Sequence, residues 1–390
     1  MTIFSFLFLL PFLRYALCDP GTVGVNYGRI ADNFPPPPPQ PPQVVKLLQG
    51  HGFTQVKLYD TDSTVLSALS GSGISVIVAL PNEQLSSAAS GESFTDSWVQ
   101  SNILAYHPKT QIVAIGHCCW QLSFFVDPQN TTGFLVPAMK TCTLSLVKYG
   151  VDSSIKVSSR SHSVRCRIRT LHPLVSQIGL GADYALFRDN PGVTDPNNGL
   201  VYKSLFEAQL DAVFAAMNAL GFNDIKVVVS ETGWPSKGDE NEIVASKPNA
   251  AAYNGNLVRR VLTGGGTPLR PDEPLDVYLF ALFNEDQKTG STSEKNYGLF
   301  YPNEEKVYDI PLTLGIHNES KSQVKAKPPT PSSGGDTGDL STSTVGQTWC
   351  VANEQAGEKR LQAGEKRPAS LLMSIYTQYF LSFLPLYFTR

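Results

Sequence analysis

The sequence lacks a strong excess of one charge, and it lacks a long uninterrupted apolar run. Its formal net charge is −3 over 390 residues. This argues against a nucleic-acid partner, because nucleic-acid binders neutralise phosphates with clustered Lys and Arg. The apolar stretch Leu371–Tyr387 is broken by Gln378 and Pro385, so it matches a membrane span or a lipid-anchor signal poorly. We therefore expect no nucleic-acid partner, and a membrane anchor stays open as the less favoured alternative.

Cysteine and histidine are also scarce, with six residues of each. No two cysteines have the C-x-x-C spacing and no histidines cluster, so no metal site is predicted. Cys18 falls in an expected signal peptide, which leaves five cysteines. An odd number is unusual for a secreted protein, because cysteines there normally pair in disulfides.

Residues 1–18 are typical of a secretory signal peptide. Ile3–Leu13 is a short apolar core, and Ala16–Cys18 offers small residues for cleavage, although no Lys or Arg precedes the core. The pattern predicts a secreted protein of the extracellular space or cell wall. Secretion would make the sequons that begin at Asn130 and Asn318 glycosylation sites.

From Thr22 onward, short β-branched runs alternate with amphipathic segments such as Leu205–Met217, which is typical of repeated βα units. The alternation predicts an α/β fold with a parallel sheet, and the pattern suits a (β/α)8 barrel. Such a barrel needs eight strands, and the sequence offers seven. The predicted strands are residues 23–27, 55–59, 74–80, 111–115, 155–157, 227–229 and 276–283.

Glu231 follows the run Val227–Val229 at the carboxyl end of a predicted strand, where Gly233 and Pro235 end that strand. A carboxylate there faces the end of a parallel barrel at which chemistry usually takes place. Trp234 beside it offers a flat apolar face for stacking on a sugar ring. The alternatives are a solvated glutamate on a turn and a tryptophan that packs in the protein interior.

Seven segments resemble plant glycoside hydrolases of family 17, the endo-1,3-β-glucanases. The resemblance extends from about Gly21 to Leu314 and is interrupted in two places. The segments are Gly24–Arg29, Val56–Asp60, Asp183–Phe187, Ser230–Ser236, Asn249–Asn256, Tyr278–Glu285 and Asn296–Pro302.

The resemblance implies a (β/α)8 barrel that hydrolyses internal β-1,3-glucosidic bonds of callose or fungal-wall glucan, without a cofactor and with retention of configuration. Retention needs two carboxyl groups about 5 Å apart, one as nucleophile and one as general acid. Glu231 matches the family's nucleophile, and Glu285 and Lys288 match charged residues that support it. The residues implied to line the glucan cleft are Tyr27, Tyr59, Trp234 and Asn284. Packing remains the alternative for Tyr59 and Trp234.

The sequence departs from the family where the general acid is expected, near Gln121. No Asp or Glu lies between Ala114 and Phe125. Loss of a general acid slows such a reaction by roughly 10²–10⁴. The alternative function is therefore a catalytically inactive glucan-binding protein or the product of a damaged gene.

Two segments can be explained as translations in the wrong frame. Codons exist for His117–Gln121 and for Arg160–Val175 that restore family sequence in another frame. The segment between Val175 and Asp183 is also shorter than in the family and lacks a strand. The barrel should then be short of one strand, with unpaired edges. Cys118, Cys119 and Cys166 would be accidents of the frame, which accounts for the odd cysteine count.

The expected organisation has four parts. A signal peptide covers residues 1–18, the barrel domain covers 19–314, and a linker rich in Lys, Pro, Ser, Thr and Gly covers 315–346. In residues 347–390, Thr348–Asn353 resembles the start of a cysteine-rich callose-binding module, truncated here and followed by an apolar tail. We expect a largely disordered tail and a monomer that acts on β-1,3-glucan. The sequence leaves open whether the role is defence, wall remodelling or callose turnover.

Overall fold

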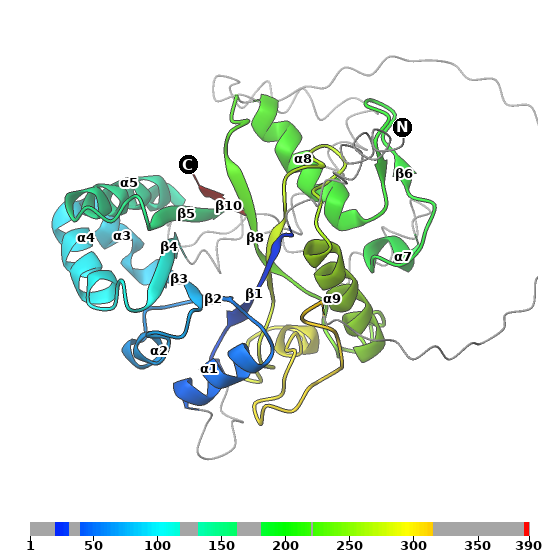
Figure 1. The fold of residues 1–390 in the computed structure, drawn as a ribbon, viewed down its shortest axis with the longest axis horizontal. Coiled ribbons are helices and arrows are strands. Elements are labelled where there is room, and N and C mark those ends of the chain that lie inside the picture. Colours follow the sequence, from blue (N-terminus) through cyan, green and yellow to red (C-terminus); the bar gives the residue numbers. More distant parts are fainter. Residues whose placement is uncertain are drawn as a thin grey trace, which may run out of the picture. The chain divides into compact units, whose positions relative to one another are not determined.

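The computed structural model describes six ranges of the chain. The expected signal peptide, the linker, the position near Gln121 and the sequons at Asn130 and Asn318 lie outside these ranges. Figure 1 shows the described part as helices arranged around a set of strands. The described ranges are residues 20–30, 40–117, 132–161, 181–219, 221–314 and 386–389.

Seven parallel strands build most of a barrel, and each begins within one residue of its predicted start. The parallel pairs connect the strands in the order β5–β4–β3–β2–β1–β9–β8. The predicted (β/α)8-type architecture with one parallel strand fewer is therefore confirmed. The strands are β1 (Thr22–Tyr27), β2 (Gln55–Leu58), β3 (Ser75–Leu80), β4 (Gln111–His117), β5 (Lys156–Ser161), β8 (Lys226–Thr232) and β9 (Asp276–Leu279).

Strand β9 is shorter than the predicted run 276–283. The segment after Leu279 leaves the regular ladder, although its amides still find partners. Leu282 N–H donates to the Asn26 carbonyl at 2.8 Å, and Ala281 N–H donates to the Tyr297 carbonyl at 3.0 Å. The apolar sequence continues because Ala281, Leu282 and Phe283 remain buried beneath this end of the barrel. Burial, rather than strand pairing, thus explains the length of the apolar run.

The position between β5 and β8 is filled by a strand that lies far C-terminal to both in the sequence. Strand β10 (Leu386–Thr389) pairs antiparallel with both neighbours and closes the barrel. Figure 1 labels it in dark red between β5 and β8. The prediction of a disordered tail therefore does not hold for these four residues.

Helices follow most of the strands, as repeated βα units require. A short two-stranded ribbon, β6 (Val193–Thr194) with β7 (Val201–Tyr202), stands apart from the barrel. The α-helices are α1 (Pro41–Gly50), α2 (Ser63–Ala68), α3 (Leu85–Ser90), α4 (Glu92–Val99), α5 (Thr132–Lys148), α7 (Ala182–Ala185), α8 (Leu205–Ala219) and α9 (Lys247–Leu262). Three further helical turns are η2 (Asn82–Gln84), η3 (Gln100–Leu104) and η4 (Thr292–Lys295).

Helix α9 connects β8 to β9, and its sequence shows why it forms there. Ser246 caps its first turn by accepting a hydrogen bond from Asn249 N–H. Arg259 and Arg260 lie in its last turn, where positive charge stabilises the helix dipole. Leu257 and Val261 are buried in the core. Helix α9 thereby packs against β1 and β9, next to the strand that carries Glu231.

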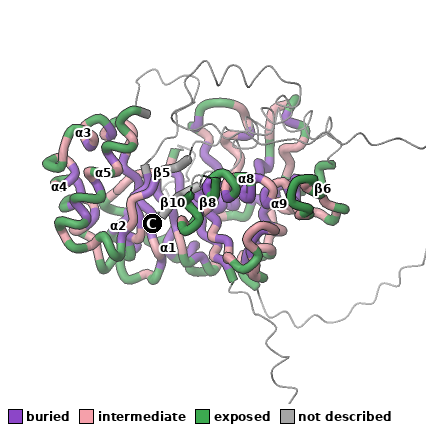
Figure 2. The backbone as a smooth tube through the Cα atoms, turned by 90° about the horizontal axis from the view of Figure 1, so that it is seen from above, coloured by how far each residue is buried: buried purple, intermediate pink, exposed green. Residues whose placement is uncertain are grey.

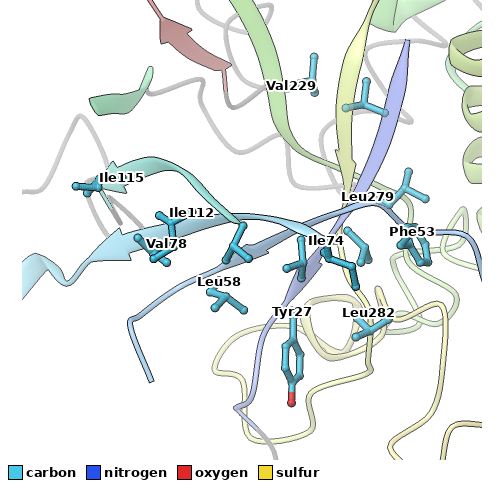
Figure 3. Packing of buried hydrophobic residues seen from close by; sticks show 14 of the residues in the cluster. Tyr27, Phe53, Leu58, Ile74, Val78, Ile112, Ile115, Val229, Leu279 and Leu282 are labelled. Carbon is cyan, nitrogen blue, oxygen red and sulfur yellow. The ribbon is translucent and has the colours of Figure 1, made fainter. Parts of the chain in front are cut away.

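The strands bury both faces, which explains their almost continuous apolar sequences. One face packs in the large core, where Val78, Ile115 and Val229 are among the labelled side chains of Figure 3. The other face holds a small cluster that includes Ile77 and Tyr278. Figure 2 shows buried residues concentrated along the strands and exposed residues on the outer surfaces of the helices. This packing fixes the strand ends from which the candidate site is built.

Within the described ranges, no helix is long and apolar enough to cross a membrane, and no three potential metal ligands cluster. Cys142 is the cysteine that these ranges contain, and its thiol is buried and free. Burial raises the pKa of the Cys142 thiol to about 12. This cysteine therefore contributes to packing and not to reactive thiol chemistry.

Candidate active site

Glu231 lies near the carboxyl end of β8, with 7% of the residue exposed. Two side chains from β2 and the residues that follow it reach the same carboxylate oxygen. The Lys57 ammonium is 2.5 Å from Glu231 Oε1, and the Tyr59 hydroxyl is 3.0 Å from it. A paired ammonium stabilises the ionised form of a carboxylate. The arrangement therefore presents an oriented, negatively charged carboxylate at the end of the barrel.

Lys57 is one of the residues of this site to which the sequence interpretation assigned no role. It is 2% exposed, and it lies opposite Asn26 of β1 in the strand register. A buried ammonium needs a charged partner to offset its loss of hydration. The sequence does carry a signal for such a role, because a charged lysine between Val56 and Leu58 in a predicted buried strand needs a polar or charged partner. Only the fold shows that its partner lies 174 residues away.

Asn26 connects the strands that carry the site. Its side-chain amide lies within hydrogen-bonding distance of the carbonyls of Ser230 on β8 and Leu279 on β9, at 3.2 and 3.1 Å. Its side-chain oxygen is 3.1 Å from the Tyr59 hydroxyl. The single hydroxyl proton can be donated to Asn26 or to Glu231 at any one time. Asn26 thus couples the position of Tyr59 to the strand that carries Glu231.

Glu285 is a second buried carboxyl group, beyond the end of β9. Ile30 N–H donates to its Oε1 at 2.9 Å. Burial raises the pKa of Glu285, and the negative charge of Glu231 acts in the same direction, whereas Lys288 and the Ile30 hydrogen bond oppose it. Glu285 therefore lies close enough to Glu231 for the two carboxyl groups to interact electrostatically. A Cβ on Gly28 would overlap with the Glu285 carboxylate, so any larger residue there would force this carboxylate to shift.

Lys288 is buried as expected of a supporting residue. Its ammonium lies 4.1 Å from the centroid of the Phe280 ring and 3.9 Å from Glu294 Oε2. A cation over an aromatic face is stabilised by the negative face of the ring. The structure thus places the predicted pair Glu285 and Lys288 in one cluster and adds Phe280 and Glu294 to it.

The predicted cleft residues are mostly engaged in packing. Trp234 is 7% exposed, its Nε1–H donates to the Val244 carbonyl at 2.9 Å, and its ring lies 5.6 Å from that of Tyr253. This agrees with the packing alternative, because little of the ring is free to stack on a sugar. Tyr59, in contrast, touches Glu231 directly. The two aromatic residues therefore differ in their relation to the site.

Tyr27 and Asn284 also lie at this end of the barrel. The Tyr27 ring packs edge-on against Phe283 with centroids 6.0 Å apart, and burial raises the pKa of Tyr27 to about 12. In Figure 3 its hydroxyl points away from the apolar core. The Asn284 side-chain oxygen accepts from Gly298 N–H at 2.8 Å and so stabilises its own loop. Tyr27 keeps a polar group at the site, while the Asn284 oxygen has a structural contact.

The profile of glycosyl hydrolases family 17 matches residues 23–168 and 168–312. The chain is 35% identical to glucan endo-1,3-beta-glucosidase 12 of Arabidopsis thaliana, an alignment that covers 92% of this chain and 74% of that protein. It is 36% identical to glucan endo-1,3-beta-glucosidase 13 of the same plant, with the same coverage.

Solved structures agree with the sequence comparisons. A β-1,3-glucanase and allergen of Cryptomeria japonica pollen superimposes with a TM-score of 0.65 at 32% identity, covering 75% of this chain and all of that one. One of two plant β-glucan endohydrolases of distinct substrate specificities gives 0.60 at 31% identity, covering 74% and 99%. With this agreement of the family profile, the sequences and the fold, the chain belongs to family 17 of the glycosyl hydrolases.

Proposed function

We propose that the chain hydrolyses internal β-1,3-glucosidic bonds of glucans such as callose and fungal-wall glucan, with retention of configuration and Glu231 as the nucleophile. The observation that carries the proposal is the buried carboxylate of Glu231, whose Oε1 is contacted by Lys57 and Tyr59 at the end of the barrel. The names of the plant relatives support the substrate class and the endo mode of cleavage.

In the proposed reaction, a carboxylate oxygen of Glu231 attacks the anomeric carbon and displaces the leaving sugar oxygen. Water then hydrolyses the covalent glycosyl-enzyme and regenerates the carboxylate. Lys57 and Tyr59 hold Oε1, which favours attack by the other oxygen. Their contacts also stabilise the carboxylate that is released in the second step.

Departure of the leaving oxygen is the difficult step in this chain. The family position of the proton donor falls near Gln121, and the sequence has no acid between Ala114 and Phe125. An unprotonated sugar alkoxide is a poor leaving group, so we expect catalysis to be slower by roughly 10²–10⁴ than with a general acid in place. Glu231 and its partners should still form the glycosyl-enzyme when the leaving group needs no proton, whereas the second step lacks the same residue as the base that activates water.

The test is release of reducing ends from soluble β-1,3-glucan by the purified full-length chain. Glu231→Gln should abolish it, because an amide cannot form the glycosyl-enzyme. Glu240→Gln is the matched control, since Glu240 is exposed on the connection between β8 and α9. A wild-type chain that binds glucan but cleaves neither it nor an activated aryl glucoside would overturn the proposal in favour of a binding protein.

We also propose that the protein is secreted and glycosylated. The support is the short apolar core within residues 1–18 and the sequons at Asn130 and Asn318. Expression in plant cells tests this directly. We expect the protein in the culture medium with a new N-terminus close to Asp19, and a mass that falls on deglycosylation. Retention inside the cells with Met1 still present would contradict the proposal.

A further inference from the structure

The barrel has a position that its own βα repeat does not fill. In the described part of the segment between β5 and β8, the strands are β6 and β7, which pair only with each other. Without another strand, β5 and β8 would each leave an edge with unpaired backbone N–H and C=O groups. Buried backbone groups of this kind destabilise a fold unless they find partners.

The segment Leu386–Thr389 satisfies both edges. Against β8 its four residues pair in continuous antiparallel register, from Leu386 opposite Val229 to Thr389 opposite Lys226. Against β5, Leu386 lies opposite Ser161 and Tyr387 lies opposite Arg160. The pairing with β8 is thus the longer of the two.

We propose that Leu386–Thr389 is an intramolecular complementing strand, which occupies the β5–β8 position in place of the missing parallel strand and on which closure of the barrel depends. Figure 1 shows the three strands side by side, and the strand order agrees. The occupant is this chain's own segment, and the receiving surface is the pair of edges at Arg160–Ser161 and Lys226–Val229.

The sequence of the segment suits this role. Leu-Tyr-Phe-Thr combines aromatic and β-branched residues that favour strands. Pro385 directly precedes it, and proline is tolerated at the border of a strand because it has no N–H to donate. The antiparallel direction also removes a topological demand, since a parallel strand would need a right-handed crossover connection.

The complementing strand also reaches the candidate site through β8. Leu386 pairs with Val229, two residues before Glu231. On the other side of β8, the register with β9 is irregular between Val229 and Thr232. Up to Val229, β8 is therefore paired on both sides, and β10 supplies the longer of the two uninterrupted ladders. Loss of β10 should loosen this part of β8 first.

Cross-linking in the full-length chain tests the register. Directly opposite residues of an antiparallel pair have Cβ atoms about 4.5–5.5 Å apart, close enough for a disulfide after small shifts. Val228→Cys with Tyr387→Cys places two cysteines opposite each other. The matched control, Val228→Cys with Thr389→Cys, offsets them by two residues. We expect peptide mapping by mass spectrometry to find the 228–387 disulfide within one chain and little of the 228–389 disulfide.

Two cross-linking results would overturn the proposal. Equal yields from the two pairs would show that the segment has no fixed register against β8. A 228–387 disulfide that joins two chains would assign the strand to a second copy instead of the same chain. Both results are independent of glucan hydrolysis, so they leave the proposed function untouched.

Hydrogen exchange on truncated chains tests whether closure of the barrel depends on Leu386–Thr389. Deletion of Leu386–Arg390 should speed exchange at least about tenfold for those protected amides within Val227–Val229 that point toward β10, because they lose their pairing partner, whereas amides that point toward β9 keep theirs. Deletion of Arg390 alone is the control and should leave exchange unchanged. A synthetic peptide of residues 385–390 should restore protection to the longer truncation. Unchanged protection after deletion of Leu386–Arg390 would overturn the proposal. If that truncation is insoluble, the cross-linking result decides.

Discussion

Lys57 and Glu231 form an ion pair across the barrel, with the ammonium 2.5 Å from the carboxylate oxygen. They come from β2 and β8, which are separated in the sheet by β1 and β9. Both residues are almost completely buried. The pair therefore has two roles that mutation can separate. Each charge neutralises the other in the protein interior, and Lys57 orients the carboxylate of the proposed nucleophile.

Lys57→Met should lower both stability and activity. Removal of one partner of a buried ion pair typically costs about 3–5 kcal/mol, because the other charge remains buried. The double variant with Glu231→Met removes both charges and should recover most of that loss in urea unfolding, although it stays inactive. A stable Lys57→Met variant with wild-type kcat would show that the ion pair matters for neither property.

Glu285 should make stability depend on pH. Burial raises its pKa above the ordinary value of 4.5, so between these two pKa values the folded state binds more protons than the unfolded state. Stability from this group is therefore greatest below about pH 4.5 and is lost as pH rises through the folded-state pKa. Glu285→Gln should remove this component and flatten that part of the profile. Urea unfolding of both proteins from pH 4 to pH 7 measures the difference.

Gly28→Ala should displace the Glu285 carboxylate, because the added Cβ would overlap with it. Overpacking of a filled interior typically costs about 1–3 kcal/mol. Gly50→Ala is the matched control, since a Cβ there meets nothing within 4 Å. We expect a lower thermal unfolding temperature and lower glucanase activity for Gly28→Ala alone. Equal behaviour of the two variants would show that Glu285 does not need its present position.

The acidity of the leaving group should determine how fast the chain cleaves a glycosidic bond. A strongly acidic phenol leaves from an aryl β-laminaribioside without a proton, so the initial burst of phenol release should be far closer to that of family members than hydrolysis of β-1,3-glucan is. Steady-state turnover should need an added nucleophile such as azide, because the missing general acid is also the base that activates water in the second step. Introduction of a carboxyl group by Gln121→Glu should raise glucan hydrolysis, by up to roughly 10²-fold if it reaches the leaving oxygen. Leu122→Glu tests the same carboxyl group at the next position in the sequence. If cleavage of both substrates were slower than in family members by the same factor, the missing general acid would not be the cause.

The coding transcript should reveal how the departure from the family arose. The boundary of the two family matches falls at residue 168, inside the segment Arg160–Val175 that can be restored in another frame. Sequencing across codons 110–185 tests the out-of-frame hypothesis. We expect a shifted frame to restore family sequence at both segments. A transcript that fails to do so would show that the segments arose by ordinary substitution.

The strands were predictable because they are local patterns. Runs such as Val227–Val229 are β-branched, bounded by turn residues and too short for helices, so their type follows from neighbouring residues alone. The same run placed Glu231 at the carboxyl end of a strand, whereas its role as nucleophile was implied by the resemblance and stays a prediction. The family resemblance also rests on short contiguous segments, and it is this resemblance that implied supporting roles for Glu285 and Lys288.

What the sequence did not reveal depends on distant partners. The role of Lys57 is set by Glu231, and Asn26 acts through carbonyls on β8 and β9. The packing of Trp234 against Tyr253 is equally invisible locally. Strand β10 is the extreme case, because Leu386–Thr389 gains its neighbours only when the rest of the barrel has left a position open.

A barrel completed by a strand far along the chain has a consequence for synthesis. Translation proceeds from the N-terminus, and domains generally begin to fold in that order. Strand β10 (Leu386–Thr389) is synthesised long after β5 and β8, so both of these strands exist for a time with one edge uncovered. Aggregation or chaperone binding would compete most strongly with folding during this interval.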